Sequence, residues 1–257
     1  MDLQLDGTTA IVTGAGKGIG LATARALLRE GARVIGVSRS ATDDVEALLA
    51  DSGFRFLEAD LSQPDAAGRV LDTLEGPLGI LVNNVGFAPV RPRGFASIDD
   101  SHWQQTFEVN LLSTVRMCRA ALPRMGSVGA IVNVASENSK LPDPLVMDYS
   151  AAKAGVLSFS KALSKEVGPD GIRVNTVSPG PVATDLWLGA DGVAQTVARE
   201  TGAAAADVER GAASGMITGR FTRPEEVADL IAVLASPRFA NLTGADIVID
   251  GGMRTTI

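Results

Sequence analysis

A serine, a tyrosine and a lysine lie close together in the middle of the chain. Ser136 ends an apolar segment, Tyr149 follows 13 residues later, and Lys153 comes 4 residues after Tyr149. Residues four apart on a helix share one face, so the phenol and the ammonium should be neighbours. A nearby ammonium favours the phenolate and lowers the pKa of a tyrosine from its ordinary value of about 10.

These side chains suit acid–base chemistry at a carbonyl or alcohol oxygen. A tyrosine whose pKa moves toward neutrality can give a proton to a substrate oxygen or take one from it. Ser136 could hydrogen-bond a substrate carbonyl and polarise it as charge develops on the oxygen. Structural interpretations also exist, because a tyrosine and a lysine one turn apart are common and a serine can cap a strand.

A glycine-rich segment near the start of the chain, TGAGKGIG at 13–20, is suited to holding a pyrophosphate. It joins an apolar strand-like run to a predicted helix. Its glycines let the backbone turn tightly and approach the phosphates, whose charge is stabilised by the helix N-terminus. It is not a Walker loop, because Lys17 is followed by Gly18 rather than by Ser or Thr.

The end of the second predicted strand indicates which dinucleotide this loop would hold. A site for NAD(H) usually places Asp or Glu there, to bind the ribose 2′-hydroxyl, whereas this chain has Ser38 and Arg39. Arg39 and Lys17 could both bind a 2′-phosphate. We therefore predict NADP(H), with NAD(H) as the alternative cofactor and two solvated surface cations as the alternative interpretation.

The segments that would position these groups alternate between apolar runs and amphipathic stretches. The predicted strands are 8–13, 33–38, 54–59, 79–84, 129–136, 172–178 and 246–252, and the predicted helices are about 18–30, 43–51, 64–75, 100–123, 148–168 and 224–235. Val and Ile dominate the strands without polar alternation, which is typical of strands buried on both faces of a parallel sheet. The repeated alternation predicts a doubly wound α/β sheet.

The composition excludes several classes of protein. The 257 residues are 46% hydrophobic and 21% charged, which excludes whole-chain disorder. The net charge of −7, without a basic segment, argues against nucleic acid as a partner. One cysteine and one histidine predict neither a disulfide nor a metal site. No apolar run is long enough for a membrane span and no signal peptide is recognisable, so we expect a cytoplasmic protein without membrane contact.

We expect a single domain over 1–257 with one irregular insertion at about 185–220. The insertion is rich in Ala, Gly and Thr and follows the sixth predicted strand. Long insertions in compact domains often serve function, so we interpret it as a lid over a substrate pocket, with a plain surface insertion as the alternative. The pocket residues predicted from the insertion and from the segment before Tyr149 are Asn138, Leu145, Met147, Leu186, Trp187 and Leu188.

Four other residues are expected to contribute less to the chemistry. Arg91 and Arg93 should lie in a solvated loop near the mouth of the site, with an acidic substrate or a carrier phosphate as the alternative role. His102 is expected at the surface or as a capping residue at a helix start, and Cys118 in the core or in an interface.

The order of these motifs makes the chain similar to the short-chain dehydrogenase/reductase family over about residues 5–253. The resemblance rests on TGAGKGIG, Asp60, NNVG at 83–86, Asn110, Ser136, the Tyr149/Lys153 pair and PGPVAT at 179–184. It implies a single-domain Rossmann fold that binds NADP(H). In that fold a doubly wound parallel seven-stranded sheet, in the order 3-2-1-4-5-6-7, carries helices on both faces.

The resemblance also implies roles for individual residues. Tyr149 would be the general acid in reduction and the base in oxidation, Lys153 would lower the pKa of Tyr149 and bind the nicotinamide ribose, and Ser136 would orient the substrate oxygen. Asn110 would hold a water that links Lys153 to solvent, and Asn83 would steady the sheet and contact the adenine ribose. The implied cofactor contacts are Gly14, Gly16, Lys17, Gly18, Ile19, Gly20, Ser38, Arg39, Asp60, Leu61, Asn83, Gly86, Tyr149, Lys153, Pro179, Gly180, Val182 and Thr184.

The leading hypothesis is an NADP(H)-dependent oxidoreductase that interconverts a carbonyl and a secondary alcohol of a small molecule. A 3-oxoacyl-thioester reductase and an NAD-dependent alcohol or sugar dehydrogenase are the alternatives. A non-catalytic nucleotide-sensing protein is disfavoured, because a sensor needs no complete tetrad. The helices over 100–123 and 148–168 are apolar on more than one face, and the resemblance implies that they pair in a homotetramer, with a dimer as the second choice.

Overall fold

One parallel sheet of seven strands forms the centre of the computed structural model, which describes residues 1–255. The strand order is β3-β2-β1-β4-β5-β6-β7, so the predicted doubly wound fold and its order are confirmed. The strands are β1 (Thr9–Thr13), β2 (Arg33–Ser38), β3 (Phe54–Glu58), β4 (Leu78–Asn83), β5 (Met125–Val134), β6 (Ile172–Pro179) and β7 (Asp246–Ile249). The domain expected over 1–257 includes two last residues that lie outside the described part of the chain.

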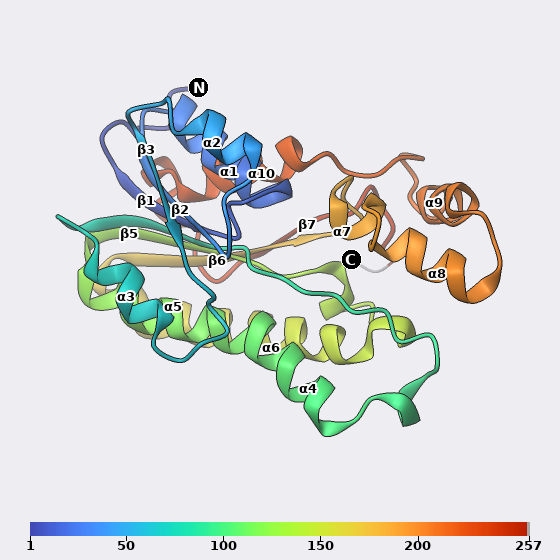
Figure 1. Ribbon diagram of the computed structural model, residues 1–257. Helices are drawn as coiled ribbons and strands as arrows, with labels where there is room; N and C mark the ends of the chain where they lie inside the picture. Colours follow the sequence, from blue (N-terminus) through green and yellow to red (C-terminus); the bar gives the residue numbers. More distant parts are fainter. Residues whose placement is uncertain (256–257) are drawn as a thin grey trace.

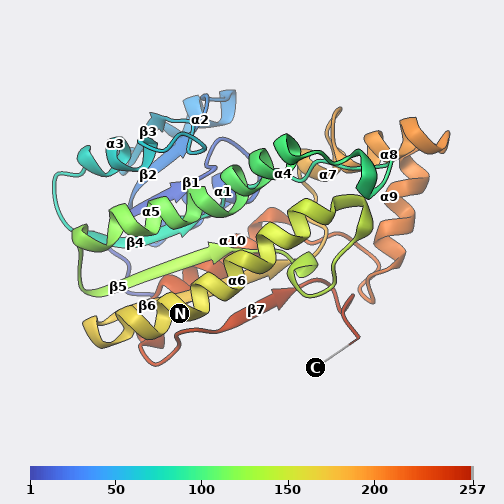
Figure 2. The ribbon, with the colours of Figure 1, turned by 90° about the horizontal axis from the view of Figure 1, so that it is seen from below.

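Helices cover both faces of the sheet (Figure 1). One face carries α1 (Gly18–Arg29), α2 (Asp43–Leu48) and α10 (Pro224–Ala235), and the other carries α3 (Ala66–Asp72), α4 (Asp100–Phe107), α5 (Ser113–Ala121) and α6 (Met147–Val167). Seen from below, α5 and α6 run alongside each other beneath the central strands (Figure 2). Each face has its own core of buried aliphatic side chains, which stabilises the strands between them.

Burial of the strands differs between the centre and the edges of the sheet. Every residue of β6 is buried, as predicted, and so are the last six residues of β5. The edge strands β3 and β7 are only partly buried. The prediction of burial on both faces therefore fails at the edges, because an edge strand has a neighbour on one side only.

The long helix predicted over 100–123 is interrupted. A turn of π-helix at Glu108–Leu112 separates α4 from α5. Within it, the side-chain amide of Asn110 donates a hydrogen bond of 2.9 Å to the backbone carbonyl of Thr106. A side chain that bonds a carbonyl one turn back competes with the helical ladder and locally widens or bends a helix. Hydrophobic periodicity does not detect such a break.

The expected insertion contains three short helices, α7 (Asp185–Leu188), α8 (Val193–Thr201) and α9 (Ala205–Ser214). They project beyond the carboxyl ends of the strands, on the right in Figure 1. α8 and α9 pack against each other, and α7 lies nearer to the sheet.

The two residues expected to be structural lie as predicted. Cys118 is buried in α5, where burial raises the pKa of its thiol to about 12. His102 lies in the first turn of α4, and its backbone N–H donates to the capping carboxylate of Asp99. Within residues 1–255, no helix is long and apolar enough to cross a membrane, and no group of three or more His, Cys, Asp or Glu side chains could hold a metal ion.

Candidate active site

A cavity of about 610 Å³ opens at the carboxyl edge of the sheet, between the strand ends and α7–α9. Open α/β sheets bind their ligands at this edge. The predicted site residues that line the cavity are Gly14, Lys17, Gly18, Ile19, Ser38, Arg39, Asp60, Leu61, Gly86, Ser136, Asn138, Leu145, Tyr149, Lys153, Pro179, Gly180, Val182, Thr184, Leu186 and Trp187. The fold thus brings most of the predicted residues to one place.

The loop between β1 and α1 presents backbone to one end of this cavity. Gly14 and Gly18 have φ angles of +67° and +57°, a conformation that favours glycine. A Cβ at Gly20 would lie 2.2 Å from the carbonyl oxygen of Gly14, and one at Gly16 would lie 2.8 Å from the hydroxyl of Ser38. Gly16 and Gly20, both predicted as cofactor contacts, therefore do not line the cavity. Each is packed against residues next to it in the loop or in a neighbouring segment.

The first turn of α1 is open to an anion. It has neither a side-chain cap nor an acidic residue. Helix N-terminal N–H groups without a cap attract negative charge. The loop and the helix start therefore form a cradle suited to a phosphate group.

Charged groups surround the end of β2. The Asp60 pKa is lowered mainly by a hydrogen bond from the hydroxyl of Ser62, and the Arg39 guanidinium contributes to the same shift. Lys17 makes an ion pair of 3.0 Å with Asp185 of α7, in which both side chains are mostly exposed. Arg39 is thus available at this end of the cavity, whereas Lys17 is shared with the inserted segment.

Ser136, Tyr149 and Lys153 meet at the other end. Ser136 follows β5, and its hydroxyl accepts a hydrogen bond of 3.2 Å from the N–H of Asn138. Tyr149 and Lys153 lie one turn apart on α6. The Nζ of Lys153 donates to the carbonyl of Val134 at 2.8 Å and lies 5.9 Å from the centroid of the Tyr149 ring. The lysine is therefore fixed by backbone, with its ammonium beside the tyrosine ring.

Burial dominates the pKa values of this group. Burial raises the pKa of Tyr149, a hydrogen bond with Ser136 opposes the rise, and the charge of Glu137 adds to it. Burial also lowers the pKa of Lys153 to about 8. Desolvation of the phenolate is thus the largest influence on the pKa of Tyr149 in this arrangement, and the lowering by Lys153 remains a prediction.

Asn110 lies beside this group but does not line the cavity. It is fully buried, its Oδ1 accepts from the N–H of Phe87, and its Nδ2 donates to the carbonyl of Phe87, both at 2.9 Å. A Cβ at Gly86 would lie 3.7 Å from Oδ1 of Asn110 and 3.8 Å from Nζ of Lys153. Asn110 therefore fixes the chain segment next to Lys153, and the predicted water relay remains a prediction.

Asn83 does not reach the cavity, and its neighbour does. The side chain of Asn83 is buried and donates to Oδ1 of Asn133 at 2.8 Å. Asn84 lines the cavity, and its Nδ2 donates to the carbonyl of Thr13 at 3.2 Å. The side chain of Asn83 thus points away from the cavity, because successive side chains at a strand end point to opposite faces, and its ribose contact remains a prediction. The other predicted role, steadying the sheet, agrees with the bond to Asn133.

The substrate end is more apolar than predicted. Met147 and Leu188 do not line the cavity, since Met147 begins α6 on another side of the helix from Tyr149 and Leu188 ends α7 past Trp187. Apolar residues that the sequence analysis did not select take part instead: Val90, Val109, Val193, Val197, Val208 and Ala212. Val193 and Val197 lie one turn apart on α8. This spacing is the one feature of the sequence that could have indicated a shared apolar face.

Glu137 is a lining residue that the prediction missed. It is 7% exposed, and its Oε2 is buried without a hydrogen-bond partner among the described residues. Burial raises the pKa of Glu137 to about 7, with further increases from Asp250 and Asp143 and an opposing effect of Arg254. Its position directly after Ser136 is the only sequence signal for it.

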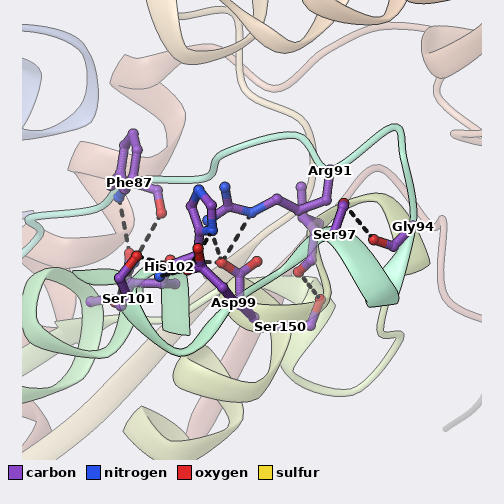
Figure 3. Close-up of polar contacts among 12 residues, drawn as sticks. Phe87, Arg91, Gly94, Ser97, Asp99, Ser101, His102 and Ser150 are labelled. Carbon is purple, nitrogen blue, oxygen red and sulfur yellow. Dashed lines mark hydrogen bonds and ion pairs between the residues drawn. The ribbon is translucent and has the colours of Figure 1, made fainter. Parts of the chain in front are cut away.

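A buried ion pair, also missed, holds the segment after β4 against α6. Arg91 reaches the fully buried Oδ2 of Asp148 through Nη2 at 2.7 Å and Nε at 3.2 Å. The hydroxyl of Thr106 donates to the same oxygen at 2.7 Å. Figure 3 shows Arg91 and Phe87 along one stretch of polar contacts beside α4 and α6. The solvated position expected for Arg91 is therefore wrong, because its guanidinium neutralises a buried carboxylate next to Tyr149.

Comparison with known proteins adds independent information about this chain. Residues 14–254 match the family model described as enoyl-(acyl carrier protein) reductase. The chain is 39% identical to D-threitol dehydrogenase of Mycolicibacterium smegmatis, over 98% of this chain and 94% of that protein. It is 34% identical to the 3-oxoacyl-(acyl-carrier-protein) reductase FabG of Vibrio cholerae, over 98% of this chain and 99% of that protein.

The fold has close counterparts among solved structures. L-sorbose reductase from Gluconobacter frateurii, complexed with NADPH and L-sorbose, has a TM-score of 0.90 and 31% sequence identity, with 100% of both chains covered. The similarity therefore extends over the whole sheet and over the inserted helices.

Proposed function

We propose that this protein uses NADP(H) to interconvert a ketone and a secondary alcohol. The premise is that the chain belongs to the short-chain dehydrogenase/reductase family of oxidoreductases. The observation that carries the proposal is the presence of Ser136, Tyr149 and Lys153 in the same cavity as the glycine loop. A proton-transfer group and a phosphate cradle at opposite ends of one cavity suit a reaction between a dinucleotide and a small molecule.

The residues at the loop fit a dinucleotide. The positive φ angles of Gly14 and Gly18 and the uncapped start of α1 leave backbone N–H groups for a pyrophosphate. A Cβ at Gly18 would lie 3.1 Å from the methyl group of Thr184, so a side chain there would crowd the cradle at a φ angle that already favours glycine. Gly14, Gly18 and Thr184 would therefore hold the phosphates, and Lys153 would hold the nicotinamide end.

The choice of NADP(H) is supported by the charges at the end of β2. Ser38 stands where a carboxylate would repel a 2′-phosphate, and Arg39 lines the cavity next to it. Lys17 lines the cavity too and would have to share its charge between a 2′-phosphate and Asp185. The NADPH complex of L-sorbose reductase supports the same choice.

When bound, NADPH would supply a hydride for the carbonyl carbon. Tyr149 holds the proton that the substrate oxygen receives, and its raised pKa keeps the hydroxyl protonated before that step. Ser136 hydrogen-bonds the same oxygen and stabilises the charge that develops there. Lys153, with a pKa lowered to about 8, can return a proton toward Tyr149 after the reaction.

The inserted helices are proposed to act as a lid on the substrate. Leu186 and Trp187 of α7 and Val197 of α8 line the cavity, and Trp187 packs on Phe221 with ring centroids 5.4 Å apart. These contacts supply an apolar wall that would exclude water from the reacting carbon.

The experiment that tests the function is consumption of NADPH with a panel of carbonyl compounds: ketoses, 3-oxoacyl thioesters, cyclic diketones and ketosteroids. We expect turnover with at least one class, a preference for NADPH over NADH, and loss of turnover in Tyr149→Phe. Tight NADPH binding without turnover of any class would contradict the proposal and favour a nucleotide sensor. Turnover restricted to the thioesters would identify the carrier-linked alternative that the Vibrio relative suggests.

A further inference from the structure

Glu137 brings an unpaired carboxylate to the wall of the substrate cavity. It begins a short 3₁₀ turn, Glu137–Ser139, directly after Ser136, and only 7% of its surface is exposed. Its Oε2 has no hydrogen-bond partner within the described part of the chain. A buried acceptor without a partner costs free energy, so a protein that keeps one at its cavity wall gains when a ligand supplies a donor.

The position of Glu137 limits where that ligand group lies. Glu137 follows Ser136 in the chain, and its charge acts on Tyr149, so both proposed contacts of the reacting oxygen are its neighbours. Asn138, the next residue, lines the cavity as well. A ligand group bound by Glu137 therefore lies close to the reacting carbon.

The surrounding charges limit the chemistry of that group. Among the described residues, the carboxylates that act on Glu137 are Asp250, after β7, and Asp143, before α6, and the cation that acts on it is Arg254. A substrate carboxylate or phosphate beside three acidic side chains would be repelled. A hydroxyl fits in either protonation state of Glu137, because it both donates and accepts, whereas a keto or ester oxygen fits only the protonated form.

We propose that Glu137 binds a substrate hydroxyl near the reacting carbonyl, which makes the substrate a neutral hydroxylated ketone and the product the corresponding polyol. This inference rests on the proposed function and assigns its substrate class. A simple ketone would leave Oε2 of Glu137 without a partner, and a thioester carbonyl could bond only the protonated form, so the ionised residue selects against both.

The test compares two four-carbon ketones that differ in hydroxyl groups, L-erythrulose and 2-butanone, with NADPH as the reductant. In Glu137→Ala we expect kcat/KM for L-erythrulose to fall about 10- to 100-fold, as for a lost hydrogen bond to a charged group. The loss for 2-butanone should be severalfold smaller, because that ketone makes no such bond and shares only the effect of the Glu137 charge on Tyr149. Glu137→Gln keeps an acceptor of the same shape and should lose less than Glu137→Ala. The matched control is Glu166→Gln, the same change on an exposed face of α6, which should affect neither ketone.

Each outcome bears on the inference. Equal losses with both ketones, or no loss with either, would overturn it. Turnover of 3-oxoacyl thioesters without turnover of L-erythrulose would also overturn it, yet would leave the proposed function intact, since Tyr149→Phe would abolish that activity. If the unaltered protein reduces no carbonyl at all, the proposed function fails and the inference fails with it. Glu137→Gln replaces a buried charge by a neutral group, so it serves where Glu137→Ala does not fold.

Discussion

The two ends of the cavity are built in different ways. Next to α1, the wall is formed by one continuous loop, 13–20, which close contacts between glycines and their neighbours hold in shape, together with residues at the ends of β2 and β3. At the substrate end, the wall consists of side chains from the segment after β4, the turn after β5 and the helices α7–α9. The first end depends on local backbone geometry, and the second on contacts between distant parts of the chain. Substitutions at the second end can therefore change the ligand without disturbing the first.

The largest effect expected is a loss of catalytic rate from a change at the substrate end. NADPH binding at the dinucleotide end should stay nearly unchanged. Tyr149→Phe removes the hydroxyl that holds the proton and keeps the ring beside Lys153. We expect kcat to fall about 10²- to 10⁴-fold, the range for loss of a general acid. NADPH affinity, measured by fluorescence titration, should change less than about threefold, since this hydroxyl makes no contact with the loop. A parallel loss of affinity would show that the two ends are not independent.

The next effect concerns stability at the substrate end. Arg91→Ala leaves the fully buried carboxylate of Asp148 with the hydroxyl of Thr106 as its remaining hydrogen-bond donor. Removing one partner of a buried ion pair costs about 3–5 kcal/mol, and we expect a loss of that size in the free energy of unfolding in urea. Arg93→Ala, in the same segment but exposed, is the matched control and should cost less than about 0.5 kcal/mol. Similar values for the two variants would mean that the ion pair does not hold this wall.

This difference between the ends also explains what the sequence could predict. The glycine loop and the Tyr149/Lys153 pair are contiguous patterns with a local geometrical reason. Strand–helix alternation predicted the doubly wound sheet, whereas the order of its strands came from the family resemblance. The pairing of Arg91 with Asp148 joins residues 57 positions apart, and no local pattern indicates it. That Asn84 rather than Asn83 lines the cavity is a shift of one residue, which reverses the face on which a strand side chain lies.

The pKa of Tyr149 likewise depends on contacts that the sequence does not show. Spacing on a helix gives the proximity of Lys153, but the desolvation that dominates both groups depends on everything packed around them. Glu137 was missed for the same reason, because an acid beside a serine has no distinctive pattern until its burial is known.

At the dinucleotide end, the prediction concerns the choice of cofactor. The double variant Lys17→Ala, Arg39→Ala should weaken NADPH binding about 100-fold, as for two lost charge-assisted hydrogen bonds, and change NADH binding less than about threefold. Arg39→Ala alone should account for most of the loss, because Lys17 is already paired with Asp185. Asp185→Asn should tighten NADPH binding by freeing Lys17. Equal weakening of NADPH and NADH would contradict the assignment of the 2′-phosphate site.

The last prediction is a change in how the free energy of unfolding depends on pH. It tests whether the buried acid at the substrate end lowers the stability of the fold. The pKa of Glu137 is raised to about 7, above the ordinary value of 4.5, so folding disfavours its charged form. Below the ordinary value the residue is protonated in both states and carries no penalty. As the pH rises toward 7 the penalty grows, up to about 3 kcal/mol. Glu137→Gln should therefore be as stable as the unaltered protein at pH 4.5 and more stable at pH 8.

Urea unfolding at these two pH values measures the difference directly. Glu166→Gln, which alters an exposed acid on α6, should show no such pH dependence. If Glu137→Gln is no more stable than the unaltered protein at pH 8, the carboxylate has a partner when folded and does not await a substrate hydroxyl. If it is more stable, the cavity wall keeps a destabilising charge where a neutral side chain would stabilise the fold. Such a loss of stability is expected of a side chain that is retained for ligand binding rather than for stability.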